Sequence, residues 1–157
     1  MQAENWRALS RIRLERSIEF YSDAVKLFDS ESYRSSASRL YFSVFHAMKA
    51  ALALKAIDRK KHSGIISEFR KLFVKTGEIS TESSKIISSV QTMRHDSDYD
   101  DYYDIDEEGL EEMIPKAKIF IDEVQRYVES RLSSDYEVDD ESEDDDIDFD
   151  NGTNPIM

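Results

Sequence analysis

The chain has 157 residues, a formal net charge of −13 and no cysteine. This length suits a single domain with one core. The lack of cysteine excludes a disulfide framework, a thiolate metal site and a thiol nucleophile. Charged residues recur throughout residues 1–20, so no apolar run there is typical of a signal peptide or a membrane span. We therefore expect a soluble, cytoplasmic protein with no membrane association.

Helices are the secondary structure that the sequence predicts throughout. The chain holds only four glycines and two prolines, which favours long helices with few tight turns. Apolar residues recur at helical spacing in five segments, and no segment of useful length alternates as a strand does. The predicted helices cover about residues 4–28, 33–57, 63–75, 81–94 and 106–132. We predict an all-α, up-and-down bundle of about five helices that spans residues 1–132.

The apolar stripes of these helices predict the core. Its central members are Tyr41, Val44, Met48, Phe69, Val90 and Phe120. The second predicted helix also carries apolar residues on its opposite side, namely Phe42, Ala50 and Ala53. A helix that is apolar all round lies in the centre of a bundle or at an interface. We therefore predict a homodimer with this helix near the interface.

Charge is distributed unevenly along the chain. Residues 133–157 contain eleven acidic residues and no lysine or arginine, whereas residues 1–75 contain 15 basic and 8 acidic residues. A segment so rich in like charge and so poor in apolar residues buries too little surface to offset its ordering entropy. We predict a disordered acidic tail over residues 133–157, which serves solubility, binds a partner, or competes with RNA for the basic half of the chain.

Three segments, in the same order and spacing, resemble one branch of the HEPN superfamily. The first is SRLYFSVFHA at residues 38–47, and the second is KHSGII at residues 61–66 followed by FVKTG at residues 73–77. The third is Arg94 with DYDDY at residues 98–102. The resemblance covers about residues 5–130 and leaves the acidic tail outside it. It implies a helical bundle that is usually a dimer.

This resemblance also implies several functions. Many HEPN proteins are ribonucleases of toxin–antitoxin or defence systems, and many others are inactive partners of minimal nucleotidyltransferases. We predict a nucleotide- or RNA-associated module of such a system that partners a nucleotidyltransferase. One alternative is a metal-independent endoribonuclease toxin, and another is a scaffolding bundle without catalysis. Neither a cofactor nor a metal site is expected.

Arg94 is the first candidate catalytic residue. The resemblance implies a motif of Arg, a polar residue, three more residues, His, any residue and Tyr. On this chain the motif places His95 at the polar position, Tyr99 where the histidine belongs and Asp101 where the final tyrosine belongs. Tyrosine is a poor base at neutral pH because its reference pKa is about 10. The motif therefore leaves Arg94 without an identified base.

Arg39 and His46 are a second candidate pair. They lie seven positions apart in one predicted helix, so they project from the same side about two turns apart. Histidine titrates near neutral pH and can accept a 2′-hydroxyl proton, while arginine keeps its charge and can stabilise the phosphorane. The alternative is structural, with His46 a hydrogen-bonded core histidine and Arg39 the partner of an acid.

Basic and aromatic residues suggest an RNA or nucleotide surface. A basic turn before a helix offers an anion site, because free N–H groups and the helix dipole add to the cations, and exposed tyrosines stack on bases. The candidate binding residues are Lys60, Lys61, His62, Ser63, Arg70, Lys71, His95, Tyr99 and Tyr102. Simpler interpretations are a capped helix after a solvated basic turn, and an acidic loop at residues 96–108 that caps the next helix.

Overall fold

The computed structural model describes the backbone of residues 2–153 and the side chains of residues 2–134. Helices make up most of the described chain, and no strand occurs within it. The elements are α1 (Ala3–Asp29), α2 (Tyr33–Ala53), α3 (His62–Phe69), the π-helix η1 (Arg70–Val74), α4 (Thr81–Tyr99) and α5 (Glu107–Thr153). The predicted all-α bundle is therefore confirmed. The second helix ends at Ala53 rather than at Ile57, and the third predicted helix is divided into α3 and η1.

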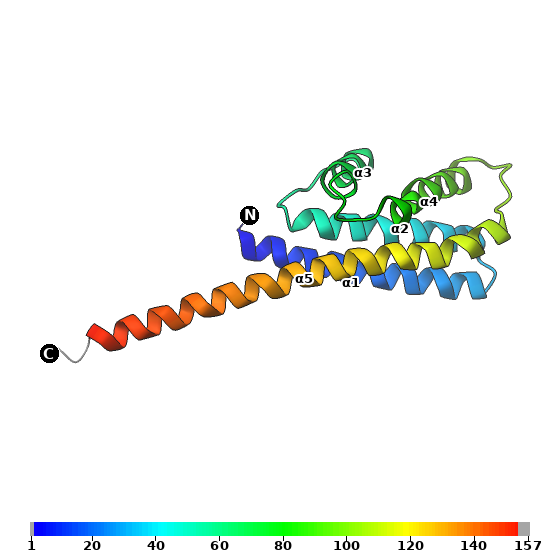
Figure 1. Cartoon of the computed structure of the whole chain (residues 1–157). Coiled ribbons are helices and arrows are strands. Elements are labelled where there is room, and N and C mark those ends of the chain that lie inside the picture. The colour runs from blue at the N-terminus through cyan, green and yellow to red at the C-terminus, as the bar shows by residue number, and fades with distance from the viewer. Residues whose placement is uncertain (1, 154–157) are drawn as a thin grey trace.

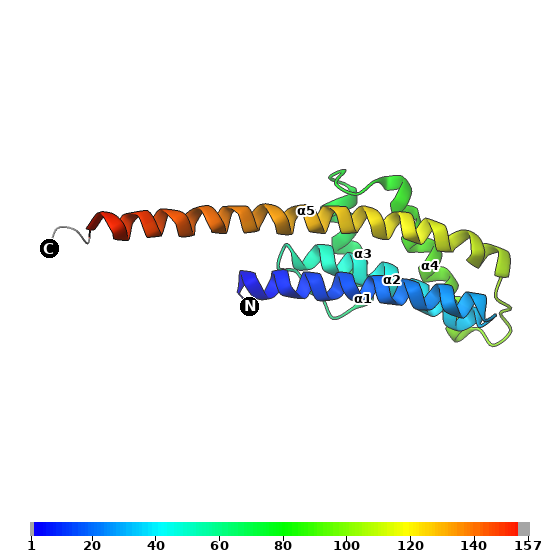
Figure 2. The same ribbon diagram turned by 90° about the horizontal axis from the view of Figure 1, so that it is seen from below.

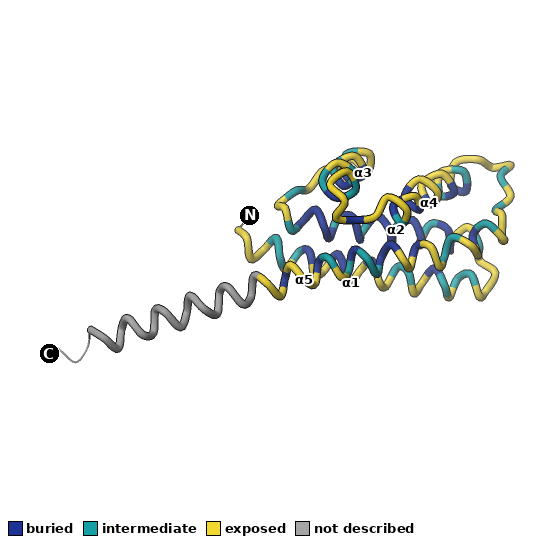
Figure 3. Tube along the Cα trace, in the orientation of Figure 1, coloured by how far each residue is buried: buried dark blue, intermediate teal, exposed yellow. Residues whose placement is uncertain are grey.

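Helix α2 occupies the centre of the bundle. It contacts α1, α3, α4 and α5, and Figure 1 shows α3 and α4 on the side of α2 that faces away from α1. The view from below in Figure 2 shows α5 beside the α1–α2 pair. In Figure 3 the tube of α2 is largely the dark blue of buried residues, whereas its neighbours alternate between buried and exposed. The helix with the most buried residues therefore forms the centre of the described bundle.

Three buried serines bind α1 to α2. Ser10 donates to the carbonyl of Ala50 at 2.7 Å, and Ser17 donates to the carbonyl of Ser43 at 2.6 Å. Ser36 of α2 donates back to the carbonyl of Ala24 at 2.7 Å. These small side chains allow the two helices to approach closely, and each hydroxyl is satisfied by a hydrogen bond despite its burial.

This packing corrects the interpretation of the second face of α2. Ala50 and Ala53 were expected on an outer face at a dimer interface, but both are 0% exposed within the monomer. Phe42 is half-buried, and its ring lies 5.7 Å from that of Phe20 in α1. The apolar residues on this side of α2 therefore do not form an exposed patch. The homodimer stays a prediction that no longer has this surface as its support.

The predicted core is confirmed. Its six central members are all 3% exposed or less and belong to one cluster: Tyr41, Val44, Met48, Phe69, Val90 and Phe120. The ring of Phe69 packs against Phe73 at 5.1 Å and edge-on against Phe120 of α5 at 5.7 Å. These contacts hold α3 and η1 against the rest of the bundle.

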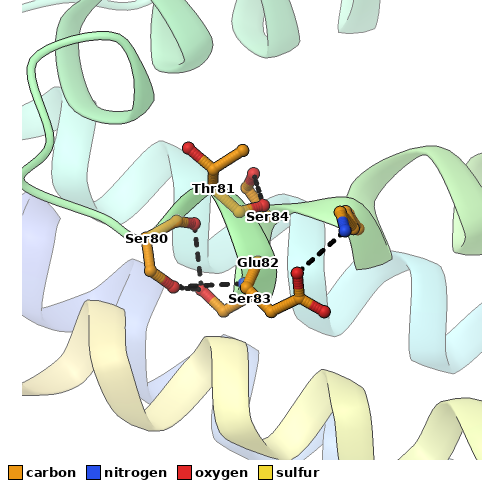
Figure 4. Close-up of polar contacts among 6 residues, drawn as sticks. Ser80, Thr81, Glu82, Ser83 and Ser84 are labelled. Atoms are coloured by element: carbon orange, nitrogen blue, oxygen red, sulfur yellow. Dashed lines mark hydrogen bonds and ion pairs between the residues drawn. The ribbon is translucent and has the colours of Figure 1, made fainter.

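A serine cap begins α4. The hydroxyl of Ser80 accepts the backbone N–H of Ser83 at 3.1 Å, which satisfies one of the free donors of the first turn (Figure 4). Glu123 of α5 accepts hydrogen bonds from the backbone N–H of Ser80 at 2.6 Å and from the hydroxyl of Ser83 at 2.5 Å. The same cap therefore links α4 to α5.

The acidic tail falls almost wholly outside the described side chains. Ser133 and Ser134 are exposed residues of α5, and the side chains of residues 135–157 are outside the described part of the chain. The disorder predicted for residues 133–157 thus stays a prediction. Among the described residues, no helix is both long enough and apolar enough to cross a membrane.

Candidate functional site

Arg94 lies over two aromatic rings of α2. Its guanidinium carbon is 4.7 Å from the ring centre of Tyr41 and 5.0 Å from that of Phe42. Its Nε lies 3.2 Å from the carboxylate of Asp98, one helical turn further along α4. That ion pair does not have hydrogen-bond geometry, since the buried Nε finds no hydrogen-bond partner among the described residues. The rings and the carboxylate hold the guanidinium in place.

His62 reaches the same aromatic group from the start of α3. Its Nδ1 is 2.8 Å from the hydroxyl oxygen of Tyr41, and its ring centre is 4.2 Å from that of Phe45. In the tautomer that donates Nδ1–H to Tyr41, the Nε2 lone pair is available to take a proton. We call Arg94, Tyr41 and His62 the RYH cluster.

The electrostatics of the RYH cluster favour a neutral histidine. Partial burial, and then the positive charges of Arg94 and Lys49, lower the pKa of His62 from its ordinary value of 6.5. Burial raises the pKa of the Tyr41 hydroxyl, although the charge of Arg94 and its hydrogen bond oppose that rise. At neutral pH the site therefore combines a neutral imidazole, a protonated phenol and a permanent cation, which are the charge states of a general base beside an electrophile.

Arg39 and His46 both pack against Phe20 of α1. The guanidinium carbon of Arg39 lies 5.7 Å from the Phe20 ring centre, and the His46 ring lies 4.9 Å from it. His46 Nδ1 donates to the carbonyl of Phe42 at 2.9 Å. Burial lowers the pKa of His46, although this hydrogen bond opposes the shift. The two residues thus share one side of α2, as their spacing predicted, and His46 also has the contacts of a core histidine.

The basic residues after His62 line a groove between α3, η1 and α4. The groove has a volume of about 500 Å³ and is lined by Ser63, Ile66, Ser67, Arg70, Lys71, Lys75 and Gln91. Arg70 donates to the hydroxyl of Ser88 at 2.7 Å, and the π-helical bond from the Lys75 N–H to the Arg70 carbonyl measures 2.9 Å. π-helical turns are frequent at functional sites. The groove and the RYH cluster are connected along the chain, because Ser63 follows His62 and Gln91 precedes Arg94 by about one turn of α4.

The other candidate binding residues are spread more widely. Lys60 and Lys61 are exposed in the turn before α3 and do not line the groove. Tyr99 and Tyr102 are 71% and 97% exposed at the end of α4 and just beyond it. The ring of His95 lies 5.1 Å from that of Tyr99. These exposed rings form a separate group at the C-terminal end of α4.

The sequence pattern did not predict that His62 and Arg94 contact the same side chain, Tyr41. In the sequence His62 is a candidate binding residue of the basic turn, whereas the candidate bases lie shortly after Arg94 or within the second helix. The two residues meet because α3 and α4 both pack on α2 next to Tyr41. Residue spacing within one helix does not predict such a contact between helices.

The fold and the RYH cluster define a small helical-bundle protein with a cationic, aromatic-lined site. The HEPN domain family model matches residues 10–127, so the chain belongs to the HEPN family. It is 35% identical over 119 residues to "Putative toxin MJ0142" of Methanocaldococcus jannaschii, which covers 76% of this chain and 79% of the relative. It is 33% identical over 119 residues to "Putative toxin MJ0605" of the same organism, and the matched segment covers 76% of this chain and 88% of the relative. A "UPF0332 protein" of Thermotoga maritima is 31% identical over 126 residues, and the matched segment covers 80% of this chain and 90% of the relative.

Proposed function

We propose that this HEPN protein is a toxin-type endoribonuclease that cleaves RNA without a metal ion through the RYH cluster. The observation that carries the proposal is the 2.8 Å contact between His62 and Tyr41, whose ring also lies under the Arg94 guanidinium. In this proposal His62, from another helix, takes the part of the histidine that the motif expects at the position of Tyr99. The names of the two Methanocaldococcus relatives support a toxin.

The reaction is an internal transphosphorylation. His62 Nε2 takes the proton of a ribose 2′-hydroxyl, and the freed oxygen forms a bond to the adjacent phosphorus. The bond from phosphorus to the 5′-oxygen breaks, and that oxygen takes a proton from solvent. The guanidinium of Arg94 stabilises the additional negative charge of the phosphorane. The products are a 2′,3′-cyclic phosphate and a 5′-hydroxyl end, and His62 returns its proton to solvent.

The groove lined by Arg70, Lys71 and Lys75 provides a path for the substrate. It is lined by Ser63, which follows His62 along the chain, and carries cations that neutralise phosphates. Attack by the 2′-oxygen needs a flexible sugar–phosphate backbone, which favours a single strand. We infer that the substrate is single-stranded RNA with its phosphates along this groove.

Cleavage of a fluorescent single-stranded RNA in EDTA tests the proposal. General base catalysis contributes about 10²- to 10⁴-fold, so we expect His62→Ala and Arg94→Ala to lose at least about a hundredfold in rate. His46→Ala and Arg39→Ala are the matched controls and keep the wild-type rate within a few fold. Wild-type activity in His62→Ala would overturn the proposal, and loss confined to the controls would move the site to the Arg39–His46 pair.

Tyr99 favours a second function. It stands where the resemblance places the catalytic histidine, and it is 71% exposed. A solvent-exposed tyrosine at the position of the motif's base favours a non-catalytic module. Such a module would bind RNA or a nucleotide and partner a minimal nucleotidyltransferase. Retained RNA binding without cleavage, in EDTA and in Mg²⁺, would support this function over the ribonuclease.

A further inference from the structure

A second cationic pocket is lined by residues near the start of α1 and the end of α2. Figure 1 shows these two helix ends at the same end of the bundle. Its volume is about 220 Å³, and its lining residues are Arg7, Leu54, Lys55, Tyr127 and Arg131. The three cations come from α1, from the turn after α2 and from α5. None of the lining residues is acidic. None of them belongs to the RYH cluster or to the groove beside it.

Tertiary contacts hold these cations in position. Arg7 donates to the carbonyl of Leu132 at 2.9 Å. The guanidinium carbon of Arg131 lies 5.1 Å from the ring centre of Tyr127, and the Lys55 ammonium lies 5.3 Å from the ring centre of Phe73. Cations held against rings and carbonyls lose less conformational entropy when a ligand binds than freely moving surface lysines do.

Helix dipoles do not explain the arrangement. A cation such as Lys55 is favoured just after the C-terminus of α2, although the last carbonyls there already accept N–H groups from Leu54, Lys55 and Ala56. Arg7, however, lies in the second turn of α1, near the positive end of that helix. Glu78 contacts Tyr127, which also contacts Arg131, so one acidic side chain already lies beside this group. A bound anion adds to the compensation of the three positive charges.

We propose that this pocket binds a phosphate monoester. The arginine guanidinium matches phosphate oxygens through paired N–H donors, and the lysine adds a compact charge. Pockets for drug-sized ligands have volumes of about 300–1,000 Å³, so 220 Å³ accommodates the phosphate and leaves the rest of the ligand outside. Tyr127 and Leu54 form the apolar side on which an adjoining sugar or base rests. The monoester is the 5′ end of an RNA or a free mononucleotide.

Binding of labelled oligonucleotides to the full-length protein tests this pocket. We use 2′-O-methyl RNA, which the RYH cluster cannot cleave, with either a 5′-phosphate or a 5′-hydroxyl, and AMP and inorganic phosphate as competitors. The 5′-phosphorylated strand is expected to bind at least about tenfold more tightly than the 5′-hydroxyl strand. Competition by AMP at similar concentrations identifies a free mononucleotide as the source, and preference for the strand alone identifies an RNA end.

Variants separate this site from general charge effects. Lys55→Gln and Arg131→Gln should lose the preference for the 5′-phosphate, whereas Lys55→Arg should keep it. Lys26→Gln removes an exposed cation near the other end of α1 and should leave the preference unchanged. Because Arg131→Gln also removes a contact to Tyr127, Lys55→Gln is the deciding variant if Arg131→Gln unfolds. Equal affinity for the two strands, together with no competition by AMP or phosphate, would overturn the proposal.

Discussion

The hydroxyl oxygen of Tyr41 lies 2.8 Å from Nδ1 of His62, while the ring of the same tyrosine lies under the Arg94 guanidinium at 4.7 Å. One buried side chain of α2 thus connects a residue of α3 with a residue of α4. Tyr41 is a positioning residue for both, because it contacts each of them and its own hydroxyl stays protonated at neutral pH.

Tyr41→Phe tests this positioning role. The variant keeps the ring under Arg94 but removes the hydroxyl, which bonds to His62 and to Arg94. We expect a loss of about 0.5–1.5 kcal/mol in the free energy of unfolding, measured by urea denaturation. The rate of RNA cleavage should fall, with a larger change in kcat than in KM. The reason is that His62 loses its orientation, while the groove proposed to bind RNA is unchanged. An unchanged kcat would show that Tyr41 does not orient His62.

The pKa of His62 is a second test. We expect NMR titration to give a pKa below the ordinary value of 6.5, because burial and the nearby cations disfavour the imidazolium. Arg94→Ala should raise this pKa, since it removes one of those positive charges. RNA cleavage should accordingly rise with pH through the lowered pKa and be constant near neutrality. A His62 pKa above 6.5, or one unaffected by Arg94→Ala, would contradict the geometry of the RYH cluster.

His46 links stability to pH. Its pKa is lowered by burial in the folded protein, so between that pKa and about 6.5 the unfolded chain binds more protons than the folded chain. Stability therefore rises with pH in this window, is fully present above about pH 6.5 and is lost as the pH falls through the folded pKa. His46→Gln should show a smaller drop in the free energy of unfolding between pH 7.5 and pH 5.5. An unchanged pH dependence of unfolding in His46→Gln would contradict this link.

The cap of α4 predicts a local stability effect. Ser80→Ala removes the acceptor for the Ser83 N–H and one partner of Glu123, so we expect a loss of about 0.5–2 kcal/mol. Ser89→Ala changes an exposed serine of the same helix with only a long 3.4 Å bond to the Lys85 carbonyl, and it should be nearly neutral. Thermal or urea unfolding of the two variants gives the comparison, and equal stabilities would dismiss the cap.

Periodicity predicted the helices and the core because both depend on local spacing. Val44 and Met48 recur on one side of α2 whatever packs against them, and all the predicted central residues are buried. The packing of α1 over Ala50 could not be predicted from spacing in the same way. In the sequence Ser10 and Ser17 have the pattern of polar surface residues. In the structure their hydroxyls donate hydrogen bonds to carbonyls of α2, which allows the two helices to pack closely.

The candidate site was predicted only in part for a related reason. Arg94 was identified from its motif, and His62 was identified as a binding residue of the basic turn. Their meeting across Tyr41 depends on how α3 and α4 pack on α2, which no spacing within one helix contains. The Arg39–His46 pair followed from helical geometry alone, and the structure adds Phe20 as a contact of both residues.

The chemical identity of the RNA ends tests the central claim most directly. Mass spectrometry of RNA incubated with the full-length protein in EDTA should find 2′,3′-cyclic phosphate and 5′-hydroxyl ends, because His62 activates the 2′-oxygen of the substrate itself. The same products should be absent with His62→Ala and with a 2′-O-methyl substrate, and present with His46→Ala. Ends that carry a 3′-hydroxyl and a 5′-phosphate, or intact RNA with the wild-type protein, would contradict the assignment of the RYH cluster as a ribonuclease site.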